Sequence, residues 1–278
     1  MTATTTSTPP TAPEQEAPQV GLGTALRTFR AVLWRDTFVT GRELGSFLAQ
    51  VIIQPFFTLF IFGKVLTGIG YVGDDYTAIL LPGVVALNGF LTALQNTTMP
   101  LILDFSWTRE IEDRLLAPIP IGWVAVEKML FGAIRGILAA VIMVPIGFLI
   151  LDDMSWPAGA YLPVFGIIVL GSLAGAAIGM IIGTSVPPTR INILFAVILM
   201  PLMFTGSTQF PWFGLENLRW FQVVCALNPL TYVSEAMRAE LVPHVPHIPM
   251  WVNLLVITGS CVVFGAIGIR GFLRRAID

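Results

Sequence analysis

The sequence predicts an all-α integral membrane protein with six transmembrane helices. Of its 278 residues, 55% are hydrophobic and only 12% are charged, and the mean hydropathy is +0.80. A soluble domain carries about 25% charged residues. The apolar runs are roughly 18–28 residues long and do not alternate with polar residues, which favours membrane-spanning helices over the ~10-residue strands of a barrel.

The amino-terminal region is predicted to contain a tail and an amphipathic helix. Residues 1–21 are rich in Thr, Pro, Ala and Glu and contain no Lys or Arg, which is typical of a disordered tail and not of a signal peptide. Over residues 22–36, Arg27, Arg30 and Arg35 lie opposite an apolar helical face. Such a helix lies in the membrane interface, with its arginines near lipid phosphates.

Six apolar segments reach the ~18–20 residues that a membrane helix needs. Internal prolines, among them Pro55, Pro82, Pro145 and Pro201, are tolerated in bilayer helices when neighbouring groups satisfy the freed carbonyl. The expected spans are residues 46–67, 78–103, 122–150, 160–184, 191–209 and 249–271.

Glycine recurs every fourth residue in the predicted fourth span. Because residues four apart share a helical face, these glycines should form a bare ridge that lets another helix approach closely. The ridge consists of Gly171, Gly175, Gly179 and Gly183.

The distribution of basic residues predicts that both termini of the domain, residues 22–278, are cytoplasmic. With this orientation twelve Lys or Arg residues lie inside and three lie outside, which satisfies the positive-inside rule. The inner set is Arg27, Arg30, Arg35, Arg42, Arg109, Arg114, Lys128, Arg135, Arg190, Arg270, Arg274 and Arg275. The outer set is Lys64, Arg219 and Arg238.

Residues 210–248 are apolar enough to suggest a seventh span, but that span would reverse the charge rule and bury Glu216 and Arg219 in lipid. We instead expect two short re-entrant helices on the outer side, separated at Asn228 and Pro229. Asn228 is suited to cap the second helix and Pro229 to begin it. Glu235 and Arg238 are three residues apart on that helix and can form an ion pair.

A charged segment between the second and third spans is predicted to form a surface helix. Trp107, Ile111 and Leu115 fall on one narrow apolar stripe, and Pro118 and Pro120 end the helix. Charged residues cover the remaining face, namely Arg109, Glu110, Glu112, Asp113 and Arg114. A helix of this kind is suited to docking onto another protein.

Two passages resemble the type-2 ATP-binding-cassette (ABC) export permeases. Residues 109–120, REIEDRLLAPIP, are similar to that family's cytoplasmic coupling helix and its exit. Residues 204–211, FTGSTQFP, and 227–238, LNPLTYVSEAMR, are similar to its carboxy-terminal signature. Within the family, the chain most resembles permeases of antibiotic and multidrug exporters, including daunorubicin-type systems, although polysaccharide exporters share the layout.

The resemblance implies that two permeases, identical or homologous, assemble with two copies of a cytosolic nucleotide-binding subunit in a bacterial plasma membrane. Residues 107–115 would dock on that subunit, with Trp107, Ile111 and Leu115 as buried anchors and the neighbouring charges fixing the register. The chain itself contains no GxxxxGK[ST] phosphate loop, since Lys64 and Lys128 are followed by Val and Met. ATP and Mg are therefore expected on the partner, with no cofactor bound by this chain and no nucleic acid partner.

Polar side chains inside two spans are candidates for a substrate path. Those in the second span recur on one helical face and either line the path or bond to neighbouring helices. They are Asn88, Thr92, Gln95 and Met99. Weaker candidates in the fifth span are Asn192, Thr205, Ser207 and Gln209. Asp104 and Arg135 are expected near span ends, where they could reach water, so neither is interpreted as a proton relay.

A mostly apolar path with scattered amides suits amphipathic drugs, antibiotics or lipids better than ions, which require rings of charge or carbonyls. A polysaccharide or lipid-linked glycan is the alternative cargo. An integral membrane enzyme is the alternative of another class, but the two histidines, His244 and His247, lie in a Pro-rich loop with only Glu240 nearby in sequence. No catalytic or metal-binding residue is predicted.

Overall fold

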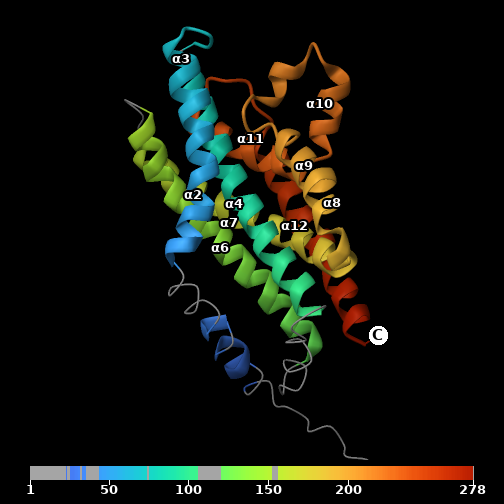
Figure 1. Ribbon diagram of the computed structural model, residues 1–278. Coiled ribbons are helices and arrows are strands. Elements are labelled where there is room, and N and C mark those ends of the chain that lie inside the picture. The colour runs from blue at the N-terminus through green and yellow to red at the C-terminus, as the bar shows by residue number, and fades with distance from the viewer. Residues whose placement is uncertain are drawn as a thin grey trace, which may run out of the picture.

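The computed structural model describes residues 23, 26–31, 33–35, 44–73, 75–105, 120–151 and 156–277. All regular secondary structure in this part of the chain is helical, and this part contains no strand. Figure 1 shows an elongated bundle in which α3 and α10 lie at one end and the carboxy-terminal end of α12 lies at the other.

The helices follow one another in this order: α2 (Leu44–Thr58), the π-helical η1 (Leu59–Val65), α3 (Leu66–Gly68), α4 (Tyr76–Leu103), α6 (Ile121–Ile150), η3 (Ala158–Ala160), α7 (Tyr161–Ser185), η4 (Pro188–Arg190), α8 (Ile191–Leu194), the π-helical η5 (Phe195–Leu199), α9 (Met200–Phe204), η6 (Trp212–Leu215), α10 (Arg219–Ala226), α11 (Pro229–Leu241) and α12 (Met250–Ile277).

Five helical stretches among the described residues are long and apolar enough to cross a membrane, so the protein is multi-pass. They correspond to the first four predicted spans and the sixth. Their bounds are Gly45–Gly68, Tyr76–Leu103, Ile121–Ile150, Ala158–Ser185 and Met250–Ala276.

The fifth predicted span, residues 191–209, is helical only from Ile191 to Phe204. These fourteen residues fall short of the ~18–20 that a straight span requires, and η5 interrupts the α-helical pattern between α8 and α9. The helix ends before Ser207, whose φ of 48° belongs to the left-handed region. The six-span count depends on this segment and stays a prediction.

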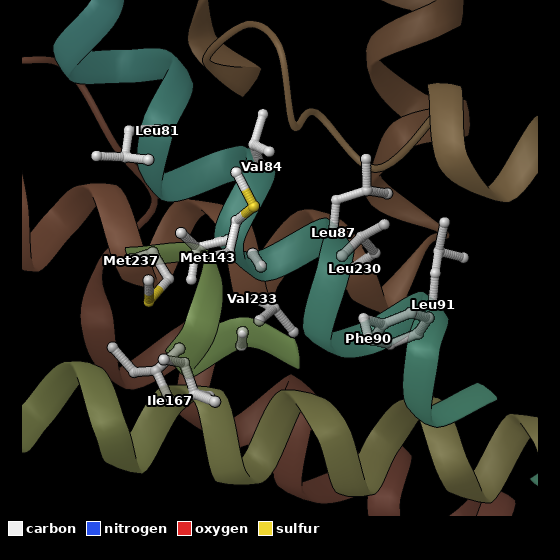
Figure 2. Packing of buried hydrophobic residues seen from close by; sticks show 14 of the residues in the cluster. Leu81, Val84, Leu87, Phe90, Leu91, Met143, Ile167, Leu230, Val233 and Met237 are labelled. Carbon is white, nitrogen blue, oxygen red and sulfur yellow. The ribbon is translucent and has the colours of Figure 1, made fainter. Parts of the chain in front are cut away.

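α4 is the central helix of the bundle. In its most apolar stretch 83% of residues are buried within the protein, compared with 22% for each of Gly45–Gly68 and Met250–Ala276. Figure 2 shows Leu81, Val84 and Phe90 of α4 packed among side chains of α6, α7 and α11. α4 therefore holds the bundle together, while the first and last spans expose most of their apolar surface to lipid or partners.

The glycine ridge of α7 is confirmed as a close-packing surface. A Cβ at Gly179 would lie 2.5 Å from the carbonyl oxygen of Leu94 in α4, and a Cβ at Gly175 would collide with the carbonyl oxygen of Phe90. A Cβ at Gly171 would lie 2.6 Å from Val233 of α11. The backbones of α4 and α7 approach this closely only because the ridge carries no side chains.

Part of the predicted amino-terminal helix is described. Residues 26–31 and 33–35 are helical, and the ring of Phe29 meets that of Trp123, in the first turn of α6, edge to face at 5.6 Å. Trp34 remains 72% exposed. The predicted location of this helix in the membrane interface stays a prediction.

We predict that Gly179→Ala destabilises the bundle, because the added methyl group would force α4 and α7 apart. Overpacking of this kind costs about 1–3 kcal/mol. The matched control is Gly166→Ala in the same helix, where nothing lies within 4 Å of the added atom. Thermal unfolding in detergent should show a lower midpoint for Gly179→Ala alone; equal midpoints would contradict the role of the ridge.

Candidate functional site

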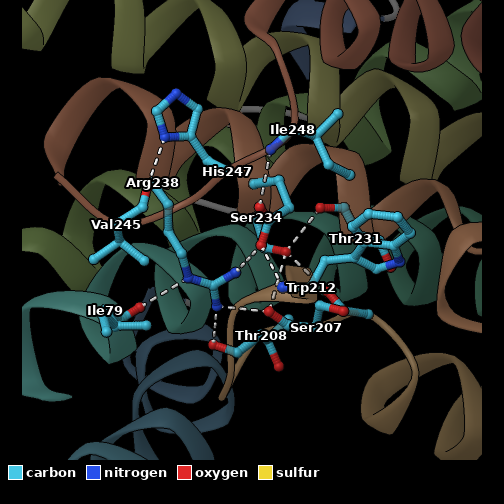
Figure 3. Close-up of polar contacts among 12 residues, drawn as sticks. Ile79, Ser207, Thr208, Trp212, Thr231, Ser234, Arg238, Val245, His247 and Ile248 are labelled. Carbon is cyan, nitrogen blue, oxygen red and sulfur yellow. Dashed lines mark hydrogen bonds and ion pairs between the residues drawn. The ribbon is translucent and has the colours of Figure 1, made fainter. Parts of the chain in front are cut away.

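The first functional region is a polar cluster around α11, which we call the α11 polar cluster. It links α11 to the segment after α9 and to the start of α4. Its side chains and backbone groups come from Ser207, Thr208, Trp212, Asn228, Thr231, Ser234, Glu235 and Arg238. Figure 3 shows most of these residues around the side chain of Arg238.

Glu235 and Arg238 form the predicted ion pair, and both side chains are completely buried. Nη1 of Arg238 lies 2.8 Å from Oε1 of Glu235. Burial lowers the pKa of Arg238, while the carboxylate of Glu235 acts in the opposite direction. The guanidinium of arginine nevertheless stays protonated, because in proteins it does not lose its proton even when it is buried.

Arg238 also donates hydrogen bonds to three backbone carbonyls of other segments. Nη2 donates to the carbonyl oxygens of Ser207 at 2.6 Å and Thr208 at 2.9 Å, and Nε donates to that of Ile79 in α4 at 3.2 Å. A Cβ at Gly83 would collide with the Thr208 carbonyl oxygen. The guanidinium therefore fastens the non-helical segment after α9 against the start of α4.

Glu235 completes this arrangement by accepting two backbone N–H groups. Trp212 N donates to Oε1 at 3.0 Å, and Ile248 N donates to Oε2 at 3.4 Å. Trp212 precedes α10 and Ile248 precedes α12. One carboxylate thus anchors both the approach to α10 and the approach to the last span.

The break between α10 and α11 follows the prediction. The side chain of Asn228 accepts a hydrogen bond from Leu230 N at 3.0 Å and caps α11, with Pro229 as the first helical residue. Nδ2 of Asn228 donates to the carbonyl oxygen of Leu202 at 2.7 Å. Ser234 donates to the carbonyl oxygen of Gly206 at 2.8 Å. Whether these helices re-enter a membrane stays a prediction.

The second region lies at the other end of α4. Nζ of Lys128, in α6, lies 2.8 Å from Oδ2 of Asp104, directly after α4, and both side chains are 8% exposed. The guanidinium of Arg275, in α12, lies 4.7 Å from the ring of Phe105. The Asp104–Lys128 pair joins α4 and α6, the two helices that flank the predicted docking helix, and the contact of Arg275 with Phe105 adds α12 to the same end of the bundle. Residues 107–115 of the docking helix lie outside the described part of the chain.

The third region is a hollow bordered by α2, α4 and the α8–α9 segment, which we call the α2–α4 hollow. It consists of a small space of about 40 Å³ and an adjoining one of about 310 Å³, which share Gln54, Leu91 and Gln95 in their walls. The small space is lined by Gln50, Val51, Gln54, Pro55, Thr58, Leu87, Asn88, Leu91, Thr92, Gln95 and Asn96. The larger is lined by Gln54, Leu91, Gln95, Ala196, Leu199, Met200 and Met203.

Three of the four predicted path residues in α4 line this hollow: Asn88, Thr92 and Gln95. Met99 is not among the lining residues. Nδ2 of Asn88 also donates to the carbonyl oxygen of Ala139 in α6 at 3.0 Å, so this residue borders the hollow and also bonds to a neighbouring helix.

The sequence interpretation missed the α2 wall of the hollow. Gln50, Gln54 and Thr58 line it and recur every four residues, the same signal that identified the α4 face. Nε2 of Gln54 reaches the sulfur of Met203 in α9 at 3.2 Å across the hollow. A second polar stripe in a membrane helix was therefore visible in the sequence.

The other predicted path residues lie elsewhere. The carbonyl oxygens of Thr205 and Ser207 accept hydrogen bonds from Thr231 and Arg238, within the α11 polar cluster. The carbonyl oxygen of Gln209 accepts one from Tyr76 at 3.0 Å. The side chain of Asn192 lies outside what the structure describes.

The expected position of Arg135 near a span end is wrong. It lies 14 residues after the first residue of α6 and 15 before its last. Nη1 donates to Oδ1 of Asn96 at 2.5 Å, and the guanidinium lies 5.2 Å from the ring of Phe47 and 5.1 Å from that of Phe131. The sequence alone did not show that these two phenylalanine rings would lie beside the guanidinium in a cation–π arrangement. Asp104, in contrast, does follow the end of α4.

We predict that Arg238→Met lowers stability strongly, because it leaves the Glu235 carboxylate buried without its partner. Breaking a buried pair costs about 3–5 kcal/mol. The double variant Glu235→Gln with Arg238→Met should lose less than the sum of the two single variants, measured from thermal unfolding in detergent. Arg219→Met, at an exposed position in α10, is the control. Strictly additive losses would contradict the coupling.

Comparison with known proteins identifies the family of this chain. The sequence pattern of the family described as ABC-2 type transporter matches residues 27–242. That range includes the α2–α4 hollow, the docking segment and the α11 polar cluster.

Two similar proteins are both named transport permease ycf38. The one from Cyanophora paradoxa is 24% identical over 221 residues, covering 74% of this chain and 72% of its own length. The one from Porphyra purpurea is 24% identical over 235 residues, covering 80% and 77%. Because the family pattern covers most of the chain and five helices are suited to span a membrane, the protein belongs to the ABC-2 type transporter family as a multi-pass membrane permease.

Proposed function

We propose that this chain is the membrane subunit of an ATP-driven exporter and that the α2–α4 hollow is part of its substrate path. The observation that carries the proposal is the hollow itself, which has an amide-lined wall and an apolar wall and is bordered by α2, α4 and the α8–α9 segment. Ligand sites in helical membrane proteins occupy such spaces between helices. Membership of the ABC-2 type transporter family supports the same function.

The driving force would come from ATP and Mg bound to a separate nucleotide-binding subunit, present in two copies. Residues 107–115 would dock on it from the cytosolic side. The Asp104–Lys128 pair supports this role, since it joins α4 to α6 on either side of the docking segment. A displacement of the docking helix would then move both helices together.

A second permease, identical or homologous, would close the hollow. The faces of α2 and of the α8–α9 segment that flank it expose large apolar side chains, including Phe57 at 55%, Val197 at 64% and Met200 at 59%. Lipid could cover these side chains. Lipid could not form hydrogen bonds with the amide side chains that line the hollow behind them, because hydrocarbon neither donates nor accepts hydrogen bonds.

The cargo would be an amphipathic drug, antibiotic or lipid that leaves the cell across a bacterial plasma membrane, with both termini of the permease in the cytoplasm. The choice is motivated by the walls of the hollow, which combine apolar side chains with scattered amides, because such a path suits amphipathic molecules better than ions. The function is tested by reconstituting the permease with its nucleotide-binding subunit into proteoliposomes. ATP-dependent movement of fluorescent amphiphiles is expected; its absence across chemically varied amphiphiles would contradict the proposal.

We predict that Ile111→Asp or Leu115→Asp abolishes co-purification of the nucleotide-binding subunit while the permease still inserts into the membrane. A carboxylate on the narrow apolar stripe would have to be desolvated at the interface without a partner. Ile111→Leu keeps the stripe apolar and serves as the control. Unchanged co-purification of the aspartate variants would remove the docking role from this helix.

A further inference from the structure

We propose that the α2–α4 hollow selects amphiphiles whose polar head carries hydrogen-bonding groups but no charge. This inference rests on the proposed function, because it names the substrate class of the proposed path. It also makes Gln54 and Gln95, which border both parts of the hollow, the residues that determine specificity.

The two parts of the hollow differ in chemistry. Amides and hydroxyls of α2 and α4 line the small space, among them Gln50, Asn88 and Thr92. Beyond Gln54 and Gln95, the larger space is lined only by apolar and thioether side chains, including Met200 and Met203. A ligand that spans both parts would place its polar head in the small space and its apolar body in the larger one.

None of the described residues that line either part is ionisable. A charged head group would therefore lose its hydration without gaining a counter-ion in the wall, which is costly inside a membrane protein. Arg135 is not among the residues that line the hollow. Its guanidinium lies behind the wall, where it donates to Oδ1 of the lining residue Asn96 and lies beside the rings of Phe47 and Phe131.

The wall instead offers amides that are available for hydrogen bonding. Within the described part of the chain, Gln50 and Gln95 make no hydrogen bond with protein groups, and Gln54 donates only to the sulfur of Met203, which is a weak acceptor. A carboxamide presents both donors and an acceptor. These three side chains can therefore bind the carbonyl, hydroxyl or amide of an uncharged head group.

The inference is tested with three fluorescent probes that share one alkyl chain and end in a primary amide, a trimethylammonium or a carboxylate group. Binding to the purified permease in nanodiscs is measured by fluorescence anisotropy, and no ATPase is needed. The amide probe should bind at least about tenfold more tightly than either charged probe. Tighter or equal binding of a charged probe, or no binding of any probe, would overturn the inference.

A charge substitution provides the matched test. Gln95→Glu should shift the ratio of ammonium to amide affinity by about tenfold or more in favour of the ammonium probe, because the wall then carries a counter-ion. Gln95→Met should weaken binding of the amide probe without strengthening binding of the ammonium probe. Met99→Glu adds the same charge one turn further along α4, at a residue that does not line the hollow, and should leave the ratio unchanged.

If Gln95→Glu does not fold, Gln54→Glu makes the same test at an exposed position of α2. An unchanged affinity ratio in the folded glutamate variant would overturn the inference. Transport in proteoliposomes separates this result from failure of the proposed function. ATP-driven export of charged and neutral probes at equal rates would contradict only the selectivity, whereas preferential binding of the amide probe without any ATP-driven movement would contradict the export function.

Discussion

The ion pair between Glu235 and Arg238 is completely buried and joins the segments that meet around α11. Arg238 donates hydrogen bonds to the backbone carbonyls of Ser207 and Thr208, where the chain is no longer helical after α9, and to that of Ile79 in α4. Buried backbone carbonyls are costly when they have no partner. The carboxylate of Glu235 balances the charge of Arg238 and accepts hydrogen bonds from the backbone N–H groups of Trp212 and Ile248, which lead into α10 and α12. One ion pair therefore connects the start of α4, the segment after α9 and the approaches to α10 and α12.

α4 connects this cluster to the opposite end of the bundle, where Asp104 follows its last turn and pairs with Lys128. Along its length the α7 glycines hold it so closely that its backbone has little room to shift. α2 and the α8–α9 segment are held less tightly. The π-helical η1 directly follows α2, and the π-helical η5 lies between α8 and α9; such stretches are frequent at functional sites. Movement around the hollow should therefore occur in these two walls, with α4 as the fixed one.

Local patterns in the sequence were sufficient for much of this arrangement. Spacing alone predicted the glycine ridge of α7, the cap at Asn228 and the ion pair of Glu235 with Arg238. What it could not supply was contact between distant segments: the bonds from Arg238 to Ser207 and Thr208, and the placement of Arg135 between two phenylalanine rings. The α2 wall was missed for another reason. Its polar stripe, which includes Gln54, lies among several phenylalanines and Pro55, and the segment was interpreted only as an apolar span.

If, as we propose, ATP on a separate subunit drives transport through the α2–α4 hollow, then the hollow must open in turn on the two sides of the membrane. Gln95→Cys, in a background of Cys225→Ala and Cys261→Ala, tests it directly in proteoliposomes that contain the nucleotide-binding subunit. The measurement is the reaction rate with a membrane-impermeant thiol reagent added to either side. Reaction should be faster from the side of the docking helix without nucleotide and from the opposite side with ATP. Rates that do not change with ATP on either side would contradict the claim.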